Sequence, residues 1–128
     1  MAAPSKGAAG EVLAARFLRD KGYDIQAANF RCRHGEIDII ATHGAYIAFV
    51  EVKTRQSDSM YLPREAVTMA KRTRLIRTAS YYLSGDPSDL QPRFDVIEVV
   101  TVPNRPMQLV EINHIIGAYE AGDLGAAF

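Results

Sequence analysis

The sequence predicts a single mixed α/β domain of 128 residues. Three observations lead to this fold class. A helical stretch is followed by three short extended stretches, a long stretch without Gly or Pro comes next, and a strand rich in β-branched residues follows it. The sequence contains no repeat, no low-complexity segment and no linker between two domains. We therefore expect residues 1–128 to form one domain with flexible ends, at about residues 1–8 and 121–128.

The first half of the chain predicts one helix and three strands. Apolar residues at helical spacing predict a helix over residues 10–21, which Gly22 ends. The expected strands cover residues 23–28, 36–42 and 46–53. A polar basic turn, residues 29–35, separates the first two strands. Because the turns between neighbouring strands are short, we expect hairpins.

The second half predicts a long helix followed by a loop and further strands. Residues 64–83 lack Gly and Pro, and Pro63 suits a first helical turn, so one helix is expected there. Its buried face is expected to carry Met69, Ile76 and Leu83, which recur every seven residues. The remaining predicted segments are a loop at residues 85–92, strands at 94–102 and 108–112, and a short helix at 115–121.

Composition excludes several classes of protein. With 48% hydrophobic and 23% charged residues, the chain has the composition of an ordinary globular domain. The longest wholly apolar run, residues 45–50, has six residues, whereas a membrane-spanning helix needs about 20. Cys32 has no partner for a disulfide, and the first ten residues carry no secretory signal. We therefore expect a cytoplasmic protein.

The charges are distributed unevenly along the chain, although the net charge is zero. Residues 52–77 hold seven basic and two acidic residues, whereas residues 78–128 hold two basic and seven acidic residues. A basic middle segment is typical of a surface that attracts a phosphate backbone. Alternatively, these basic residues form the solvated face of a helix and bind no ligand.

Three charged residues lie in strands that otherwise resemble a core. Asp38 lies between two isoleucines, and an apolar run typical of a strand covered on both faces continues into Glu51 and Lys53. Alternation puts Glu51 and Lys53 on one face, and antiparallel pairing can bring Asp38 near Glu51. Two buried carboxylates so close need protonation, a cationic side chain or a divalent metal ion. In the structural alternative, Lys53 forms a simple ion pair with one of them.

These residues resemble a known nuclease signature. Asp38, Glu51 and Lys53 resemble the PD-(D/E)xK motif of restriction-endonuclease-like nucleases, whose core has the order of elements predicted above. Further blocks resemble the YraN family of predicted endonucleases, which is similar to archaeal Holliday-junction resolvases. The blocks that carry this resemblance are residues 7–11, 29–31, 35–41, 49–55, 65–67 with Lys71, 93–96 and 114–115.

The resemblance implies a fold of order α-β-β-β-α-β with a further short C-terminal strand, and a metal-dependent endonuclease acting on DNA. Asp38 and Glu51 would be acidic ligands of Mg²⁺ or Mn²⁺, with the main-chain carbonyl of Val52 as a third oxygen. Lys53 would position or deprotonate the attacking water. Glu11 would be an outer or second-metal ligand, although an acid in a first helical turn also suits the helix dipole. Branched DNA and a homodimer are implied by the same resemblance.

Other polar residues have expected roles around this site. The basic residues expected to contact phosphates are Arg31, Arg33, Arg55, Lys71 and Arg74. Glu36 is either a further ligand or a hydrogen-bond partner of the basic turn. Cys32 and His34 lack a second pair for a zinc site, and His43 and His114 are interpreted as structural. The aromatic residues are few and scattered, so the sequence does not indicate a surface for base stacking.

Two alternatives to a DNA endonuclease stay open at this stage. The first is a nucleic-acid-binding protein without catalysis on a nuclease fold, in which the basic long helix carries the function. The second is a ribonuclease that uses the same site. Metal binding and the choice of substrate distinguish these three functions.

Overall fold

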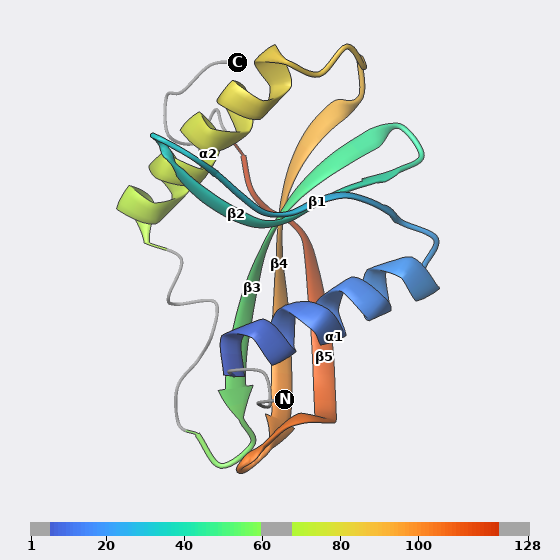
Figure 1. The fold of residues 1–128 in the computed structure, drawn as a ribbon, viewed down its shortest axis with the longest axis vertical. Coiled ribbons are helices and arrows are strands. Elements are labelled where there is room, and N and C mark those ends of the chain that lie inside the picture. Colours follow the sequence, from blue (N-terminus) through green and yellow to red (C-terminus); the bar gives the residue numbers. More distant parts are fainter. Residues whose placement is uncertain (1–5, 60–67, 121–128) are drawn as a thin grey trace.

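The computed structural model describes residues 6–59 and 68–120, and within them the chain forms two helices and five strands (Figure 1). In chain order these elements are α1 (Lys6–Asp20), β1 (Asp24–Cys32), β2 (Gly35–His43), β3 (Tyr46–Gln56), α2 (Met69–Ser84), β4 (Gln91–Val102) and β5 (Arg105–Tyr119). The predicted mixed α/β fold class is confirmed. Most of the ends that were expected to be flexible lie outside the described residues.

The five strands form one mixed sheet in the order β1-β2-β3-β4-β5. β1, β2 and β3 pair antiparallel, as the predicted hairpins require, and β4 and β5 also pair antiparallel. β3 and β4 run parallel, with α2 in the connection between them. Figure 1 shows α1 crossing the long strands β3 to β5, whereas α2 lies beside the β1–β2 hairpin. Neither helix in the described part of the chain is long and apolar enough to cross a membrane.

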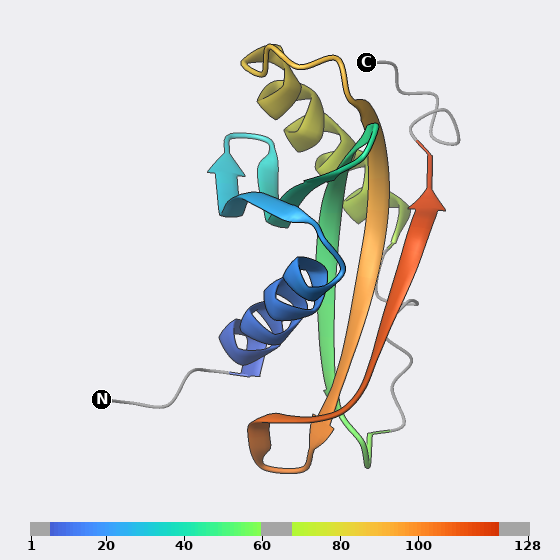
Figure 2. The ribbon, with the colours of Figure 1, turned by 90° about the vertical axis from the view of Figure 1, so that its right-hand side faces the viewer.

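Two apolar clusters hold the helices against opposite faces of β3. Ile47 and Phe49 belong to the cluster that includes Ile76 of α2, whereas Ala48 and Val50 belong to the cluster under α1. This division follows from the alternation of side chains along a strand. β3 is therefore covered on both faces, as its apolar run predicts, and Figure 2 shows α1 against the curved sheet.

The β1–β2 hairpin is longer than predicted. The polar segment at residues 29–35 was expected to be a turn, but the ladder between the strands reaches Cys32 and Gly35. The turn itself consists of Arg33 and His34. Pairing with β2 satisfies the backbone groups of this segment, and this outweighs its polar composition.

The prediction of a short helix at residues 115–121 is wrong for the part that the structure describes, because β5 continues to Tyr119. Ile115 pairs with β4, and Gly117 adopts a φ of +62°. The Gly117 N–H donates a hydrogen bond to Oδ1 of Asp95 at 3.0 Å. Long-range pairing with β4 thus decides the conformation of this segment.

The helix α2 begins later than predicted. Thr68 caps it by accepting a hydrogen bond from the N–H of Lys71 at 3.2 Å, and residues 63–67 lie outside the described residues. The buried residues of α2 are Leu75, Ile76, Thr78 and Ala79. Met69 is 57% exposed, so its predicted place in the core is wrong. Met69 is the first residue of the helix and precedes the turns that pack on the sheet.

Gly10 permits a close approach of α1 to β3. A Cβ added at Gly10 would overlap the side-chain hydroxyl of Thr54. We expect Gly10→Ala to lower the free energy of unfolding by about 1–3 kcal/mol, as overpacking does, although alanine normally favours a helix. Urea unfolding measures this change. Gly7→Ala is the matched control, because nothing lies within 4 Å of a Cβ added at Gly7. Equal stabilities of the two variants would contradict the prediction.

Candidate functional site

The carboxylate of Asp38 lies where β2 separates from β3. The ladder between these strands ends at the pair Ile39 and Val50. Beyond it, Oδ2 of Asp38 accepts a hydrogen bond from the main-chain N–H of Val52 at 2.8 Å. A charged acceptor makes such a bond strong. Asp38 therefore links the diverging strands through its side chain and directs its carboxylate toward β3.

Glu51 is the buried carboxylate of β3 and it contacts two lysines. Glu51 is only 6% exposed. Oε1 of Glu51 lies 3.0 Å from Nζ of Lys53 and 2.6 Å from Nζ of Lys71. Lys53 comes from the same face of β3, as alternation predicts, whereas Lys71 comes from the start of α2. Among the described residues, the crossover helix therefore contributes one of the two cations that contact Glu51.

The two carboxylates have opposite pKa shifts. Burial, the charge of Glu51 and the charge of Glu11 raise the pKa of Asp38 to about 7, although the bond from Val52 opposes them. Burial also acts to raise the pKa of Glu51, but Lys71 and Lys53 hold it below its usual range. Glu51 is therefore ionised at neutral pH, whereas Asp38 titrates near it.

The pKa values of the two lysines are also shifted in opposite directions. Burial, together with the neighbouring Lys71, holds the pKa of Lys53 below its usual range, although Glu51 acts against them. Burial also acts to lower the pKa of Lys71, but its bond to Glu51 prevails and raises it. Lys53 therefore releases a proton more readily than Lys71, which stays charged.

Glu11 reaches the same region from α1. It lines a cavity of about 480 Å³ together with Asp38, and its charge contributes to the raised pKa of Asp38. The expected place of Glu11 in the first helical turn is wrong, because α1 begins at Lys6 and Glu11 falls in the second turn. The helix dipole acts mainly on the terminal turn. It therefore does not account for a carboxylate at this position.

The donor atoms of the candidate metal centre are oxygens. Within residues 6–59 and 68–120, no three His, Cys, Asp or Glu side chains form a complete metal cluster. The candidate set is Asp38, Glu51 and the main-chain carbonyl of Val52, with Glu11 as a further carboxylate. Mg²⁺ is often bound through one or two carboxylates and keeps several waters. The donor set thus suits Mg²⁺ or Mn²⁺, and a cation would offset the burial and the repulsion by Glu51 that raise the pKa of Asp38.

Most of the arginines expected to contact phosphates surround the β1–β2 hairpin and α2. Arg31 is exposed and its Nε lies 3.3 Å from Oε2 of Glu36, so Glu36 is an ion-pair partner of the basic segment. Arg33 is exposed in the turn, and Arg74 is exposed on α2 next to it. These arginines form a positive surface beyond the two carboxylates.

Arg55 lies on β3, two positions after Lys53. Its side chain is partly buried, and Nη1 donates to the carbonyl oxygen of Gln56 at 3.4 Å. Nε of Arg55 is buried and has no hydrogen-bond partner among the described residues. Most buried polar atoms have such a partner. The strand that carries Glu51 therefore also holds a buried donor without a partner among the described residues.

Four aromatic side chains that are distant in the sequence meet between the hairpin and α2. We call Phe30, His34, Tyr81 and Tyr82 the aromatic patch. Its ring centroids lie 6.4 Å apart for Phe30 and Tyr81, 5.2 Å for Phe30 and Tyr82, and 6.0 Å for His34 and Tyr81. Sequence reasoning missed this patch, because it depends on a long-range contact. The adjacent tyrosines at the end of a basic helix were its local signal.

A second charged cluster is buried on the α1 face of the sheet. Asp95 of β4 is fully buried. Its carboxylate accepts from Nε and Nη2 of Arg93 at 3.0 and 2.9 Å, and lies 2.7 Å from Nε2 of His114. The Gly117 N–H is a further donor, and Arg93 also donates to the Tyr23 hydroxyl at 2.6 Å. This cluster links β4 to β5 and to the segment after α1, so we interpret it as structural.

The fold and the site together define a class of protein. It is a mixed α/β protein whose central strand carries a carboxylate–lysine cluster where the neighbouring strand separates from it. The chain belongs to the uncharacterised protein family UPF0102, which matches residues 10–99. This match includes every residue of the carboxylate–lysine cluster.

Several relatives have the same family description. The UPF0102 protein of Caldanaerobacter subterraneus subsp. tengcongensis is 45% identical over 114 residues, which cover 88% of this chain and 93% of the relative. The UPF0102 protein of Chlorobaculum tepidum is 44% identical over 122 residues, or 93% and 95% of the two chains. The relative from Symbiobacterium thermophilum is 52% identical over 99 residues, or 77% and 84%.

Proposed function

We propose that the chain is a metal-dependent endonuclease that hydrolyses phosphodiester bonds in DNA. The observation that carries this proposal is the convergence of Asp38, Glu51 and Lys53, the residues of the PD-(D/E)xK resemblance, where β2 separates from β3. The order of elements, with a parallel fourth strand after a crossover helix, supports a restriction-endonuclease-like fold and the relation to the YraN family.

The proposed substrate is branched DNA of the Holliday-junction type, in the cytoplasm. Such a junction requires two symmetric cuts, which a homodimer with two equivalent sites would supply. The exposed arginines at the hairpin and on α2 support binding to a phosphate backbone.

The residues of the site have distinct roles in this proposal. Asp38, Glu51 and the carbonyl of Val52 would hold Mg²⁺ or Mn²⁺, which when bound polarises the phosphate and acidifies a coordinated water. Lys53 would orient the attacking water, and its lowered pKa, caused by burial and Lys71, lets it give up its own proton to solvent before it takes one from that water. In its charged form, Lys53 pairs with Glu51. It also offsets negative charge that develops on the phosphate. Lys71 stays protonated and holds Glu51 in place.

The ion pairs of Glu51 favour a second candidate function. Lys53 and Lys71 already neutralise the carboxylate, so the cluster is electrostatically balanced without a metal ion. A nucleic-acid-binding protein that does not cut its ligand would keep this arrangement. A ribonuclease would use the same residues as the DNA endonuclease and differ in substrate alone.

Cleavage assays distinguish these functions. The purified chain is incubated with Mg²⁺ or Mn²⁺ and with labelled four-way junction, flap, nicked duplex and single-stranded DNA, and with RNA of matching sequence. We expect metal-dependent cutting of branched DNA that Asp38→Ala and Glu51→Ala abolish. Cutting of RNA alone would favour the ribonuclease. Tight binding without cutting, unchanged by Asp38→Ala, would favour the binding protein and overturn the proposal.

Removal of Lys71 is expected to strengthen metal binding. Because Lys71 competes with a cation for Oε1 of Glu51, Lys71→Met should bind Mn²⁺ about tenfold more tightly. Isothermal titration calorimetry measures this affinity. Arg77→Met is the matched control, since Arg77 is an exposed cation of the same helix and does not contact Glu51. Equal Mn²⁺ affinities of the two variants would contradict competition at Glu51.

A further inference from the structure

The helix α2 connects the carboxylate–lysine cluster to the aromatic patch. At about 100° per residue, Arg74, Arg77 and Tyr81 lie within about 60° of one another around the helix axis. All three are exposed, and Tyr81 exposes 51% of its surface. Lys71, which contacts Glu51, precedes Tyr81 by ten residues, or about 15 Å along the helix. The helix therefore carries a row of cations that ends at an exposed ring.

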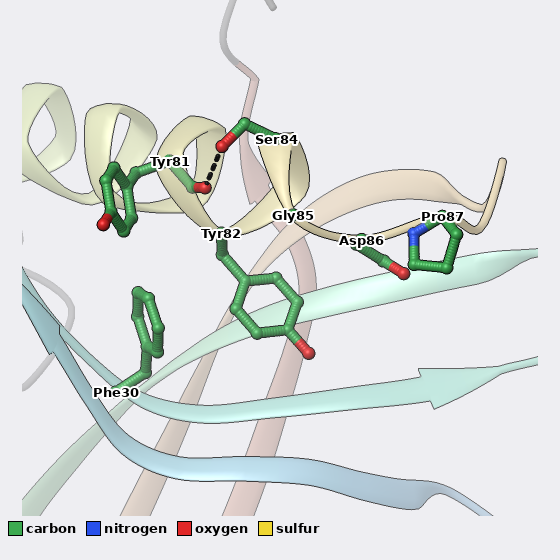
Figure 3. Close-up of a pocket in the computed structure, with 7 residues that line it drawn as sticks. All are labelled: Phe30, Tyr81, Tyr82, Ser84, Gly85, Asp86 and Pro87. Atoms are coloured by element: carbon green, nitrogen blue, oxygen red, sulfur yellow. Dashed lines mark hydrogen bonds between the residues drawn. The ribbon is translucent and has the colours of Figure 1, made fainter.

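A pocket of about 510 Å³ opens at the end of this row, between α2 and the β1–β2 hairpin (Figure 3). Figure 3 shows the rings of Phe30, Tyr81 and Tyr82 on one side of it, and Asp86 and Pro87 of the following loop on the other. The rings of Phe30 and Tyr82 meet edge to face at 86°. A volume of this size is typical of sites that admit a small planar group such as a nucleobase.

Arginine lies on one side of the aromatic patch, and the carboxylate of Asp86 lies on the other side of the pocket. Nε of Arg33 lies 3.4 Å from Nε2 of His34, whose ring lies 6.0 Å from that of Tyr81. On the pocket wall, the carboxylate of Asp86 is engaged within its own loop by the N–H and hydroxyl of Ser88, at 3.1 and 2.8 Å. Arginines beside exposed rings are the combination that binds single strands, because cations follow the phosphates while bases stack on the rings.

We propose that α2 and the β1–β2 turn bind an unpaired nucleic-acid strand, with a base stacked on Tyr81 and phosphates held by Arg74 and Arg77. This inference rests on the proposed function for the class of substrate and makes it more specific. A stacked strand advances about 3.4 Å per nucleotide, so the rise of about 15 Å along α2 between Lys71 and Tyr81 corresponds to about four nucleotides. The preferred substrate therefore has an unpaired segment beside the cleavage point.

Binding without metal tests this inference, because cleavage cannot then interfere. Fluorescence anisotropy of the full chain in EDTA is measured with labelled single-stranded DNA, single-stranded RNA and duplex DNA of one sequence. Tyr81→Ala is expected to weaken single-strand binding by about tenfold or more, with duplex binding changed less than about twofold. Tyr81→Phe keeps the ring and should keep the affinity.

Tyr46→Ala is the matched control for loss of an exposed tyrosine. Tyr46 is 43% exposed, its ring lies 5.1 Å from the guanidinium of Arg93, and it does not line the pocket beside the aromatic patch. We expect this variant to bind single strands like the wild type. Equal affinities of Tyr81→Ala and Tyr46→Ala overturn the inference, and so does an equal loss of duplex and single-strand binding.

The binding experiment and the cleavage assays test the two proposals separately. Selective loss of single-strand binding in Tyr81→Ala supports the inference even if metal-dependent cleavage is never observed, in which case the endonuclease proposal fails alone. Preference for RNA over DNA supports the stacking surface and contradicts a DNA substrate. If the wild type binds neither single strand, the inference is overturned whatever the cleavage assays show.

Discussion

Replacement of Asp95 by alanine is expected to lower the free energy of unfolding by about 3–5 kcal/mol, as when one partner of a buried ion pair is removed. The substitution leaves Arg93 and His114 without the carboxylate that they contact at 2.9 and 2.7 Å. It also leaves the Gly117 N–H without an acceptor, which carries a further desolvation cost. Urea unfolding followed by circular dichroism measures the change.

The exposed Asp89 provides the control for this substitution. Asp89→Ala removes the same charge from a loop, so the free energy of unfolding should change by less than about 0.5 kcal/mol. Similar losses in the two variants would show that net charge, and not the buried network, determines the effect. The structural interpretation of Asp95 would then be wrong.

Asp95 also makes the stability of the protein sensitive to acid. Burial acts to raise the pKa of Asp95, but the bonds from His114 and Arg93 hold it below its ordinary value of 3.8. A carboxyl whose pKa is lower in the folded state stabilises the fold above its unfolded pKa, and this contribution is lost as the pH falls through the folded pKa. Asp95→Asn cannot ionise. Its stability should therefore fall less than that of the wild type between about pH 5 and pH 2.

Asp38→Asn is expected to reduce metal-dependent cleavage by at least about 100-fold while the fold is kept. The amide oxygen of asparagine can still accept the hydrogen bond that the Val52 N–H donates at 2.8 Å. The negative charge, by contrast, is lost from the candidate metal centre. Initial cleavage rates with Mn²⁺ measure the effect on catalysis, and thermal unfolding checks the fold.

Two further variants complete this experiment. Asp24→Asn removes an exposed carboxylate from the start of β1 and should cleave at the wild-type rate. Glu51→Gln should also lose cleavage, but it additionally removes the ion pairs with Lys53 and Lys71 and so lowers stability. A wild-type rate in Asp38→Asn would contradict the role of Asp38 as a metal ligand.

The central part of the fold follows from local sequence patterns. The apolar run of β3 predicts a strand covered on both faces, and the two clusters around Phe49 and Val50 confirm it. Alternation along the same strand predicts that Glu51 and Lys53 share a face, and their 3.0 Å ion pair confirms that as well. Both predictions depend on residues within one strand, where side-chain directions are fixed by the backbone.

One failed prediction and two contacts that local patterns did not reveal depend on segments that are distant in the sequence. The segment that includes Ile115 has a composition that suits a short helix, but pairing with β4 makes it a strand. The position of Lys71 against Glu51 depends on how α2 packs on the sheet. The same packing joins Phe30 to Tyr82. Intrinsic propensity and periodicity carry no information about such tertiary contacts.

The strand order of the sheet has a consequence for how the protein folds. β1, β2 and β3 are neighbours both in the sequence and in space, so Asp38, Glu51 and Lys53 come together through hairpins of low contact order. The parallel pairing of β3 with β4 must wait for closure of the long connection that contains α2. In vectorial synthesis the acidic pair would therefore assemble first, and Lys71 would reach Glu51 in a later and slower phase.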